Sequence, residues 1–226
     1  MRAMILAAGR GERMGELTIA TPKPLLPLAG HYLIEHVIYR LKRAGIHDII
    51  INVSYLAEKI KKALGNGKRY GVKITYSEEK ERLETGGGIV HALPLLGKQA
   101  FIVVSGDIVT DYPFEQLIYH SQKQAHLILI DNPSFKPQGD FGINNGYLST
   151  EHLPKLTYAN IGIYSPQFFT DVQSSHFPLS QLLFPAIAKS EISGEYYQGI
   201  WFNIGTPNDL AAAGQFLAQH PPFQFI

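Results

Sequence analysis

Short apolar runs alternate with amphipathic segments through the first half of the chain. The run RAMILAA (2–8) is almost continuously apolar, which is typical of a strand buried on both faces of a parallel sheet. The segment YLIEHVIYRLKRAG (32–45) repeats apolar residues at helical spacing, and Gly45 follows as a stop signal. The alternation continues as a strand, a helix and a strand in DIIINV (48–53), LAEKIKKALG (56–65) and VKITYS (72–77).

A fourth apolar run, FIVVSGD (101–107), follows a short predicted helix around residues 88–96. Strands and helices that alternate at this period predict an α/β fold with a Rossmann-like, doubly wound sheet. Ligands of such sheets bind at the carboxyl ends of the strands. We therefore expect the chemistry to lie in the residues that directly follow the apolar runs.

The second half of the chain is richer in predicted strands. Two apolar runs predict strands at 126–131 and 156–165, and FGINNGYLS (141–149) contains an Asn-Gly pair typical of a hairpin. The segment 178–190 predicts a helix that Pro185 limits or kinks. This pattern favours a mixed sheet rather than a purely parallel one.

The stretch 199–220 predicts a strand, a turn and a final helix. Thr206 has the character of an N-cap, with Pro207 at the first helical position and Asp209 placed to complete a capping box. The apolar, proline-broken tail HPPFQFI (220–226) is expected to pack on the surface or fray. We predict one domain over 1–226.

Composition and charge exclude several classes of function. The 226 residues carry a net charge of +1, so no bulk field favours nucleic acid or a membrane surface. The chain has no cysteine, which excludes disulfides and thiolate chemistry and favours a cytoplasmic location. The first residues do not have the pattern of a signal peptide, so we expect none, and no apolar run in the sequence is long enough to span a membrane. It does not identify a protein partner, and a monomer is compatible with it.

A glycine-rich loop follows the first predicted strand. In ILAAGRGERM (5–14), Gly9 and Gly11 let the backbone approach an anion, and two arginines add positive charge. The loop is not a Walker A motif, and it lacks the third glycine of a dinucleotide fingerprint, because Met14 stands there. A purely structural turn is the alternative.

Lys23 lies between Pro22 and Pro24 in TPKPLLPLAG (21–30). The prolines are expected to hold the backbone extended and so to fix the lysine before a substrate arrives. A fixed cation downstream of a glycine–arginine loop suits stabilisation of phosphate charge. An isolated lysine on the surface is the alternative.

Three further features carry candidate chemistry. Gly86, Gly87 and Gly88 enter a predicted helix and permit close approach to a flat ligand, or form a flexible loop. Asp107 ends a buried strand, where a carboxylate suits Mg²⁺ or caps a helix. Asn203 ends a later strand, and it is either a turn residue or a second ligand to that metal.

The nine histidines show no sequence spacing typical of a metal site. Six of them scatter across predicted elements, and we interpret these as structural or exposed: His31, His36, His47, His91, His120 and His126. No Gly-x-Ser-x-Gly elbow is present, which argues against a serine hydrolase.

Taken together, these motifs resemble the sugar-1-phosphate nucleotidylyltransferases. The resemblance covers most of the chain: LAAGRGERM, TPKPLLPLAG, LETGGGI, VSGD, DNP…GDF, SGEYYQG and W-x-x-IGT. Within the family, the short chain and the LETGGG and GDF forms most resemble the N-acetylmuramate α-1-phosphate uridylyltransferases of bacterial cell-wall recycling. The resemblance implies a nucleotide-diphosphosugar transferase fold, with a nucleotide-binding half (1–125) and a β-rich sugar-binding half (126–226).

The resemblance also implies roles for individual residues. UTP, a sugar 1-phosphate and Mg²⁺ would be bound, with Arg13, Lys23 and Asp107 taking part in catalysis. The nucleotide would be bound by Ala8, Gly9, Gly11, Glu12, Arg13, Lys23, Glu84, Thr85 and Gly86. The sugar would contact Asp140, Asn160 and Glu195, and the metal would be held by Asp107 and Asn203.

Two positions depart from the family pattern. Many relatives have an aspartate where Asn203 stands, although the bifunctional N-acetylglucosamine-1-phosphate uridylyltransferases have asparagine there. Relatives often have Arg-Pro where this chain has Gly15-Glu16, which bears on nucleotide affinity rather than on the reaction.

Three other functions remain open from the sequence. One is a nucleotidylyltransferase for another substrate: glucose, mannose or N-acetylglucosamine 1-phosphate, or choline phosphate. Another is a non-catalytic nucleotide-sugar-binding module, against which Lys23 and Asp107 argue. The last is a dinucleotide oxidoreductase, which Met14 disfavours.

Overall fold

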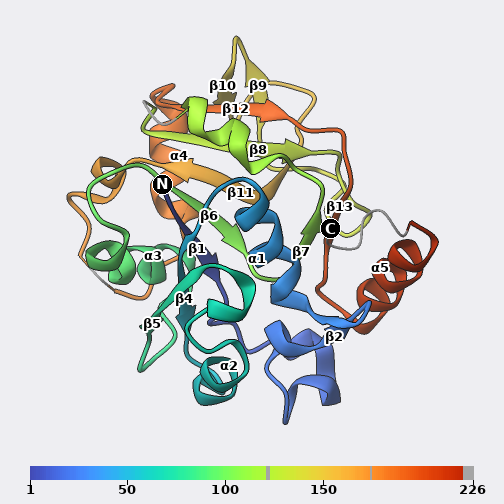
Figure 1. Cartoon of the computed structure of the whole chain (residues 1–226). Coiled ribbons are helices and arrows are strands. Elements are labelled where there is room, and N and C mark those ends of the chain that lie inside the picture. The colour runs from blue at the N-terminus through green and yellow to red at the C-terminus, as the bar shows by residue number, and fades with distance from the viewer. Residues whose placement is uncertain (121–122, 174, 221–226) are drawn as a thin grey trace.

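A nine-stranded mixed sheet runs through the computed structural model, which describes residues 1–120, 123–173 and 175–220 (Figure 1). Its spatial order is β5-β4-β1-β6-β11-β8-β12-β10-β9. The strands are β1 (Arg2–Leu6), β4 (Asp48–Val53), β5 (Lys73–Glu78), β6 (Phe101–Ser105), β8 (Ala125–Ile130), β9 (Gly142–Asn144), β10 (Tyr147–Ser149), β11 (Thr157–Tyr164) and β12 (Ile192–Tyr196). The predicted doubly wound α/β sheet is confirmed.

The strand order reverses between β1 and β6. After β1, the next strands of the sheet are added on one side of it, first β4 and then β5. β6 then pairs with β1 on the opposite side, and all of these strand pairs are parallel. β11 is antiparallel to both β6 and β8. A reversal of this kind leaves a crevice at the carboxyl ends of β1 and β6, where ligands of open α/β sheets bind.

Alternate strand residues pack into two separate cores. On β6, Ile102 and Val104 belong to one core, while Phe101 and Val103 belong to the other. Helix α1 (Leu33–Arg43), α2 (Ala57–Leu64) and the 3₁₀ helix η4 (Phe114–His120) cover the first face. Helices α3 (Glu84–Leu96) and α4 (Ser180–Ala188) cover the second face, together with η5 (Pro166–Phe169). The molecule is therefore a three-layer sandwich.

A third, smaller core closes one side of the crevice. Here α5 (Pro207–Gln219) packs beside two small sheets, β13–β7 and β2–β3. Their strands are β13 (Trp201–Asn203), β7 (Ile108–Thr110), β2 (Pro27–Leu28) and β3 (His31–Tyr32). The remaining elements are the 3₁₀ helices η1 (Glu12–Thr18), η2 (Lys23–Leu25) and η3 (Lys68–Tyr70).

Several local predictions are confirmed at the level of single residues. The Thr206 side chain caps α5 by accepting a hydrogen bond from the Asp209 N–H, and the Asp209 carboxylate accepts one from the Thr206 N–H, which completes a capping box. Gly45 follows α1 with φ at 77°, a conformation that glycine adopts without strain. The Asn-Gly hairpin joins β9 and β10, and both of its turn residues have positive φ.

Other local predictions were wrong or incomplete. Helix α4 continues through Pro185 to Ala188, so the proline does not end it. Helix α3 begins at Glu84, so the glycine triplet lies inside a helix and not in a flexible loop. Strand β12 was not predicted. The tail from residue 221 onward lies outside the described residues.

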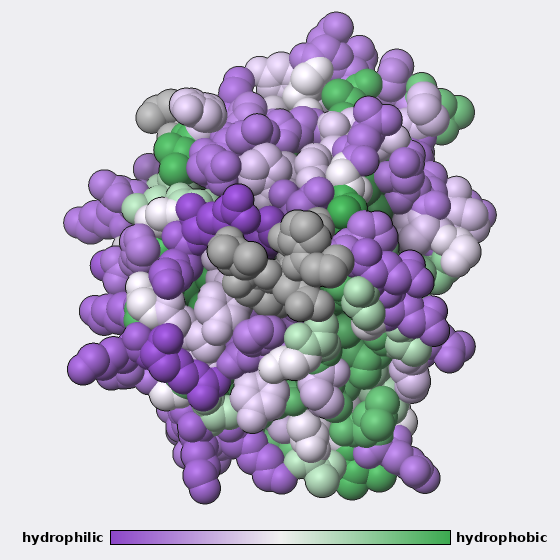
Figure 2. Space-filling model, turned by 45° about the vertical axis from the view of Figure 1, so that its right-hand side comes forward, coloured by the Kyte–Doolittle hydropathy of each residue, from purple (hydrophilic) through white to green (hydrophobic). Residues whose placement is uncertain are grey.

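The surface on the α5 side is mostly hydrophilic in its upper part, and apolar side chains gather toward the lower right (Figure 2). Among the described residues, no helix has the length and apolar character needed to cross a bilayer.

Candidate active site

Three adjoining pockets open at the crevice between β1 and β6, and Leu6 at the end of β1 lines all of them. The charged pocket has a volume of about 300 Å³. It is lined by Leu6, Ala7, Gly9, Arg10, Gly11, Glu12, Arg13, Lys23, Pro24, Arg82, Gly106, Asp107 and Gly205. The middle pocket adjoins it at Gly9, Arg82 and Asp107. Thr85 in turn lines both the middle pocket and a third, aromatic pocket.

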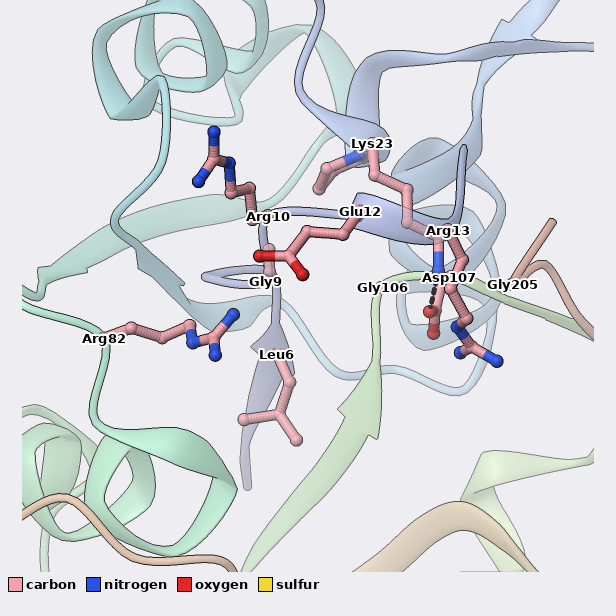
Figure 3. A pocket seen from close by; sticks show the side chains of 13 residues that line it. Leu6, Gly9, Arg10, Glu12, Arg13, Lys23, Arg82, Gly106, Asp107 and Gly205 are labelled. Carbon is pink, nitrogen blue, oxygen red and sulfur yellow. Dashed lines mark hydrogen bonds and ion pairs between the residues drawn. The ribbon is translucent and has the colours of Figure 1, made fainter. Parts of the chain in front are cut away.

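The charged pocket has an excess of positive charge. Four cationic residues and two acidic residues line it, a difference of two charges. Figure 3 shows the guanidinium groups of Arg10 and Arg82 on one side of the Glu12 carboxylate, with Lys23 and Asp107 on the other. The sequence analysis did not single out Arg82. Such a pocket suits a polyanion such as a triphosphate.

Gly11 is required by its conformation and by its neighbours. Its φ is 71°, and a Cβ there would lie 3.0 Å from Lys23 Cβ and 3.2 Å from Thr18 Cγ2. The Gly11 carbonyl accepts hydrogen bonds from the Met14 N–H at 2.9 Å and the Thr18 hydroxyl at 3.0 Å. Gly11 therefore lets the loop fold back onto Lys23. By contrast, Gly9 has open space where a Cβ would be.

Lys23 and Asp107 form an ion pair inside this pocket. Lys23 Nζ lies 2.5 Å from Asp107 Oδ2, and the two side chains are 11% and 27% exposed (Figure 3). Both groups can therefore reach a ligand in the pocket. The prediction of an extended backbone at Lys23 was wrong: Pro22 is extended, but Lys23 itself begins the helix η2. The lysine is fixed by burial and by this short helix.

A buried polar network shapes the middle pocket. Asn52 accepts a hydrogen bond from the Ala7 N–H at 2.7 Å and donates one to Glu79 at 2.7 Å. Glu79 also accepts a hydrogen bond from the Leu83 N–H at 3.1 Å. The network links the glycine-rich loop to the start of α3. The sequence did not lead us to predict this network, although a polar Asn52 in the otherwise apolar end of the run 48–53 is a signal for a buried hydrogen-bonding group.

Glu84 and Thr85 line the middle pocket at the first turn of α3. Glu84 has φ at 62°, an unfavourable conformation for a residue with a Cβ, and such strain clusters at ligand sites. The Thr85 hydroxyl oxygen accepts a hydrogen bond from the Leu179 N–H at 3.0 Å. The proton of the Thr85 hydroxyl remains available to a ligand. Ala8 lines the same pocket.

The structure does not bring Gly86 to the cleft as the sequence suggested. The N–H groups of Gly86 and Gly87 both donate to the Phe177 carbonyl at 3.1 Å, and a Cβ on Gly86 would lie 2.3 Å from the Phe177 ring. These N–H groups are therefore already used. Glycine is needed at these positions because the segment before α4 packs directly on α3.

The aromatic pocket contains two of the three residues expected to contact a sugar. It is lined by Leu6, Thr85, Phe135, Lys136, Asp140, Phe141, Thr157, Tyr158, Asn160, Pro178, Leu179, Ser180, Leu183, Phe184, Trp201 and Asn203. Asp140 contacts Lys136 Nζ at 2.5 Å and accepts a hydrogen bond from the Tyr158 N–H at 2.9 Å. Asn160 lies at an irregularity in β11 with φ at 56°. A bulge of this kind redirects a side chain.

Glu195, the third residue expected to contact a sugar, lies elsewhere. It is on β12 and accepts a hydrogen bond from the Tyr112 hydroxyl at 2.8 Å, on the sheet face covered by α1 and η4. It does not line the aromatic pocket, whose leucines belong to the other core. The alternation of side chains along β12 accounts for this difference.

Asp107 and Asn203 are brought together by pairing of short strands. Asn203 on β13 lies opposite Ile108 on β7, and the Ile204 N–H donates to the Asp107 carbonyl at 2.9 Å. Each side chain lines part of the same cleft. Both offer oxygen atoms, one of them from the partly exposed Asp107 carboxylate, and this donor set suits a hard cation such as Mg²⁺.

Known proteins match this chain over nearly its whole length. A family model described as nucleotidyl transferase matches residues 2–220. The chain is 43% identical over 216 residues to the N-acetylmuramate alpha-1-phosphate uridylyltransferase of Neisseria meningitidis serogroup B, covering 91% of this chain and 94% of the relative. It is 29% identical to the mannose-1-phosphate guanylyltransferase catalytic subunit beta of Xenopus tropicalis. That alignment covers 93% of this chain and 62% of the guanylyltransferase.

Solved structures show the same fold. A Bacillus anthracis structure described as a glucose-1-phosphate thymidylyltransferase matches with a TM-score of 0.84 and 21% identity, covering 96% of this chain and 95% of the other. HddC from Yersinia pseudotuberculosis, complexed with GMP-PN, matches with a TM-score of 0.81 and 21% identity, covering 96% and 99%. The likeness extends over the whole sheet and both helical layers.

Proposed function

This chain is a nucleotidyltransferase that belongs to the sugar-1-phosphate nucleotidylyltransferase family, and we propose that it transfers UMP from UTP to N-acetylmuramate 1-phosphate. The products would be UDP-N-acetylmuramate and pyrophosphate. The observation that carries the proposal is one continuous cleft with a cationic end and an aromatic end. The cationic end suits a triphosphate, and the aromatic end suits a sugar with a lactyl substituent, which has both a methyl group and a carboxylate.

In the proposed reaction, a phosphate oxygen of the sugar 1-phosphate attacks the α-phosphorus of UTP. The new P–O bond forms as the bond to the β-phosphate breaks, and pyrophosphate leaves. A phosphate monoester has its second pKa near ~6, so the attacking group is already largely dianionic near pH 7. No general base is needed, which agrees with a charged pocket lined by arginine, lysine and carboxylate but by no histidine.

The protein's part is to position two anions and offset their charge. Lys23 and Arg13 would contact the triphosphate, and the loop from Ala8 to Glu12 would wrap the nucleotide. Glu84 and Thr85 would face the base from the first turn of α3. Positioning and electrostatic stabilisation account for most catalysis of phosphoryl transfer.

Asp107 would hold Mg²⁺, with Asn203 as a second oxygen ligand. The cation, when bound, would neutralise charge on the phosphates during the substitution. Asn203 is neutral, so the two protein ligands bring one negative charge, and phosphate oxygens would supply the rest.

The sugar is assigned from two observations. The relative with 43% identity is named for N-acetylmuramate α-1-phosphate. Phe135 and Phe184 in the wall of the aromatic pocket suit the methyl group of a lactyl ether, and Lys136 beside them offers a cation to the lactyl carboxylate. Asp140 and Asn160 offer hydrogen-bonding groups to hydroxyls. This assignment would place the enzyme in peptidoglycan recycling in the cytoplasm. The absence of cysteine agrees with that location.

The nucleotide is tested by comparing UTP, GTP, dTTP and CTP at equal concentration with N-acetylmuramate 1-phosphate. We expect UTP to give a kcat/KM at least about tenfold above each of the others, because one missing or extra polar group at a base edge costs about 1.4 kcal/mol or more. Identification of the nucleotide sugar by mass spectrometry checks this result. A preference for GTP would retain the reaction type and overturn the base assignment.

A further inference from the structure

A cluster of two histidines and one glutamate lies away from the proposed active site. One ligating atom of each of His120, His126 and Glu195 lies within 4.8 Å of the others. They come from the end of η4, from β8 and from β12. None of them lines the charged, middle or aromatic pocket. The proposed reaction therefore does not use them.

The ring of His126 is oriented by its neighbours. It is 3% exposed, and its Nδ1 lies 2.8 Å from the Ser193 hydroxyl oxygen. That hydroxyl donates to the Ala125 carbonyl at 3.4 Å, which leaves its oxygen free to accept a hydrogen bond from Nδ1–H. In the tautomer with the proton on Nδ1, Nε2 carries a lone pair. Fixing the tautomer through the second nitrogen is typical of a metal-binding histidine.

The lone pair of His126 Nε2 faces a carboxylate oxygen. Within the described part of the chain, Nε2 is buried and has no hydrogen-bond partner, while Glu195 Oε2 lies 3.5 Å away. The other oxygen of Glu195 accepts the Tyr112 hydroxyl at 2.8 Å. Two electron-rich atoms face each other here, and a cation between them would satisfy both.

We propose that His120, His126 and Glu195 bind one divalent transition-metal ion such as Zn²⁺, through two imidazole nitrogens and one carboxylate oxygen. Nitrogen donors favour Zn²⁺ over Mg²⁺, which prefers an all-oxygen shell. Zinc bonds of about 2.0–2.2 Å place tetrahedral donor atoms about 3.3–3.5 Å apart. Glu195 Oε2 lies 3.5 Å from His126 Nε2 and 3.8 Å from His120 Nε2, close to these values. Water would complete the tetrahedron.

One adjustment is needed for binding. The rings of His120 and His126 are stacked, with centroids 3.6 Å apart and planes 4° from parallel. Lone pairs in parallel ring planes do not converge on one ion, so the His120 ring must rotate. Its side chain is 32% exposed at the end of η4, which leaves room for this movement. The ion would then join η4 to two strands of the central sheet.

The test is a titration with Zn²⁺ in excess Mg²⁺, which keeps the oxygen ligands of the active site occupied. We expect one equivalent of Zn²⁺ to bind the wild-type protein. With Zn²⁺ roughly 100-fold above Kd, Tm should rise by about 5–10 °C. H120Q and E195Q should weaken Zn²⁺ binding by about 100-fold. His152 is exposed and lies outside the cluster, so H152Q should leave Zn²⁺ binding unchanged. Co²⁺ in place of Zn²⁺ should give the visible absorption of a tetrahedral site.

Each outcome decides the proposal. If the wild-type protein binds no stoichiometric Zn²⁺, or if H120Q binds it equally well, the site does not exist. H120Q replaces a partly exposed residue, so it keeps the test valid if E195Q fails to fold. Nucleotidyl transfer should be the same in H120Q and in the wild type, because His120 touches none of the three pockets.

Discussion

At the scale of single residues, Lys23 and Asp107 would exchange partners during the proposed reaction. Their side chains now neutralise each other at 2.5 Å. A triphosphate and a cation offer each group a partner of opposite charge, so binding of both substrates would separate the pair without leaving either charge isolated. The ion pair would therefore hold the two proposed catalytic groups at the position where the reaction needs them.

Replacing Lys23 with alanine should lower kcat by about 10²-fold or more, the usual cost of removing one donor that stabilises developing charge. Lys98 is exposed outside the cleft, so K98A is the matched control and should keep wild-type kcat. The measurement is pyrophosphate release at saturating UTP and sugar 1-phosphate. Normal turnover by K23A would show that the lysine has no catalytic role.

The positions of residues followed from the sequence where a motif fixes one local geometry. Gly11, Lys23 and Asp107 all line the charged pocket, as a phosphate loop and a strand end suggested. Gly86 did not follow, because a glycine triplet indicates close approach but not the approaching group. Here that group is Phe177 and not a base. Glu195 does not line the aromatic pocket for a similar reason: one residue along a strand exchanges the two faces of the sheet.

At the scale of elements, the glycines of α3 let two segments pack directly on each other. A Cβ on Gly87 would lie 1.9 Å from the Ser175 carbonyl oxygen, and one on Gly88 would lie 2.6 Å from the Glu79 carboxylate. The first contact holds the segment that leads into α4, and the second adjoins the network that orients α3. Helix α3 therefore forms a structural connection between the middle pocket and the aromatic pocket.

The variant G87A should destabilise the fold by about 1–3 kcal/mol, because a methyl group would force backbone apart. Gly214 in α5 is the matched control, since its nearest neighbour to an added Cβ is Leu28 at 3.7 Å. G214A should instead stabilise the protein by about 0.5–1 kcal/mol. Urea unfolding of both variants checks this pair. Equal effects would contradict the packing role of α3.

Elements with strong patterns were predictable, and short polar ones were not. The α1, β4 and β6 segments follow their apolar periodicity closely. Strand β12 has the sequence ISGEY, whose serine and glycine carry little strand propensity, and it forms because β8 offers a parallel edge. The bulge at Asn160 also depends on pairing with β8, which no local pattern encodes.

At the scale of the whole molecule, pH should affect stability through a buried histidine. Burial lowers the pKa of His36 from 6.5 to about 4. Between these two values the unfolded chain binds a proton that the folded protein does not bind, so the free energy of unfolding should fall as pH decreases. The loss should approach about 3 kcal/mol, at about 1.4 kcal/mol per pKa unit.

Denaturation of the wild type and of H36Q between pH 7 and pH 4 measures this contribution. Other groups titrate in both proteins, so their difference isolates His36. The variant should lose part of the pH dependence while remaining folded at pH 7. Identical slopes would mean that His36 has the same pKa in the folded and the unfolded protein, so that burial does not lower it.

The overall architecture was largely predictable from the sequence. The mixed sheet, the reversal after β1 and the cleft at the strand ends all follow from alternating patterns. The His120, His126 and Glu195 cluster was not predictable, because its residues come from three elements and share no sequence spacing. Its donor atoms meet only once β8 and β12 pair.

The central claim is the transfer of UMP to N-acetylmuramate 1-phosphate, and pyrophosphate release tests it most directly. The assay would contain UTP, Mg²⁺ and, in parallel, the 1-phosphates of N-acetylmuramate, N-acetylglucosamine and glucose. We predict release mainly with N-acetylmuramate 1-phosphate, because Phe135, Phe184 and Lys136 in the aromatic pocket suit the methyl and carboxylate groups of its lactyl ether. Faster release with glucose or N-acetylglucosamine 1-phosphate would contradict the substrate assignment, and release with none of them would contradict the reaction itself.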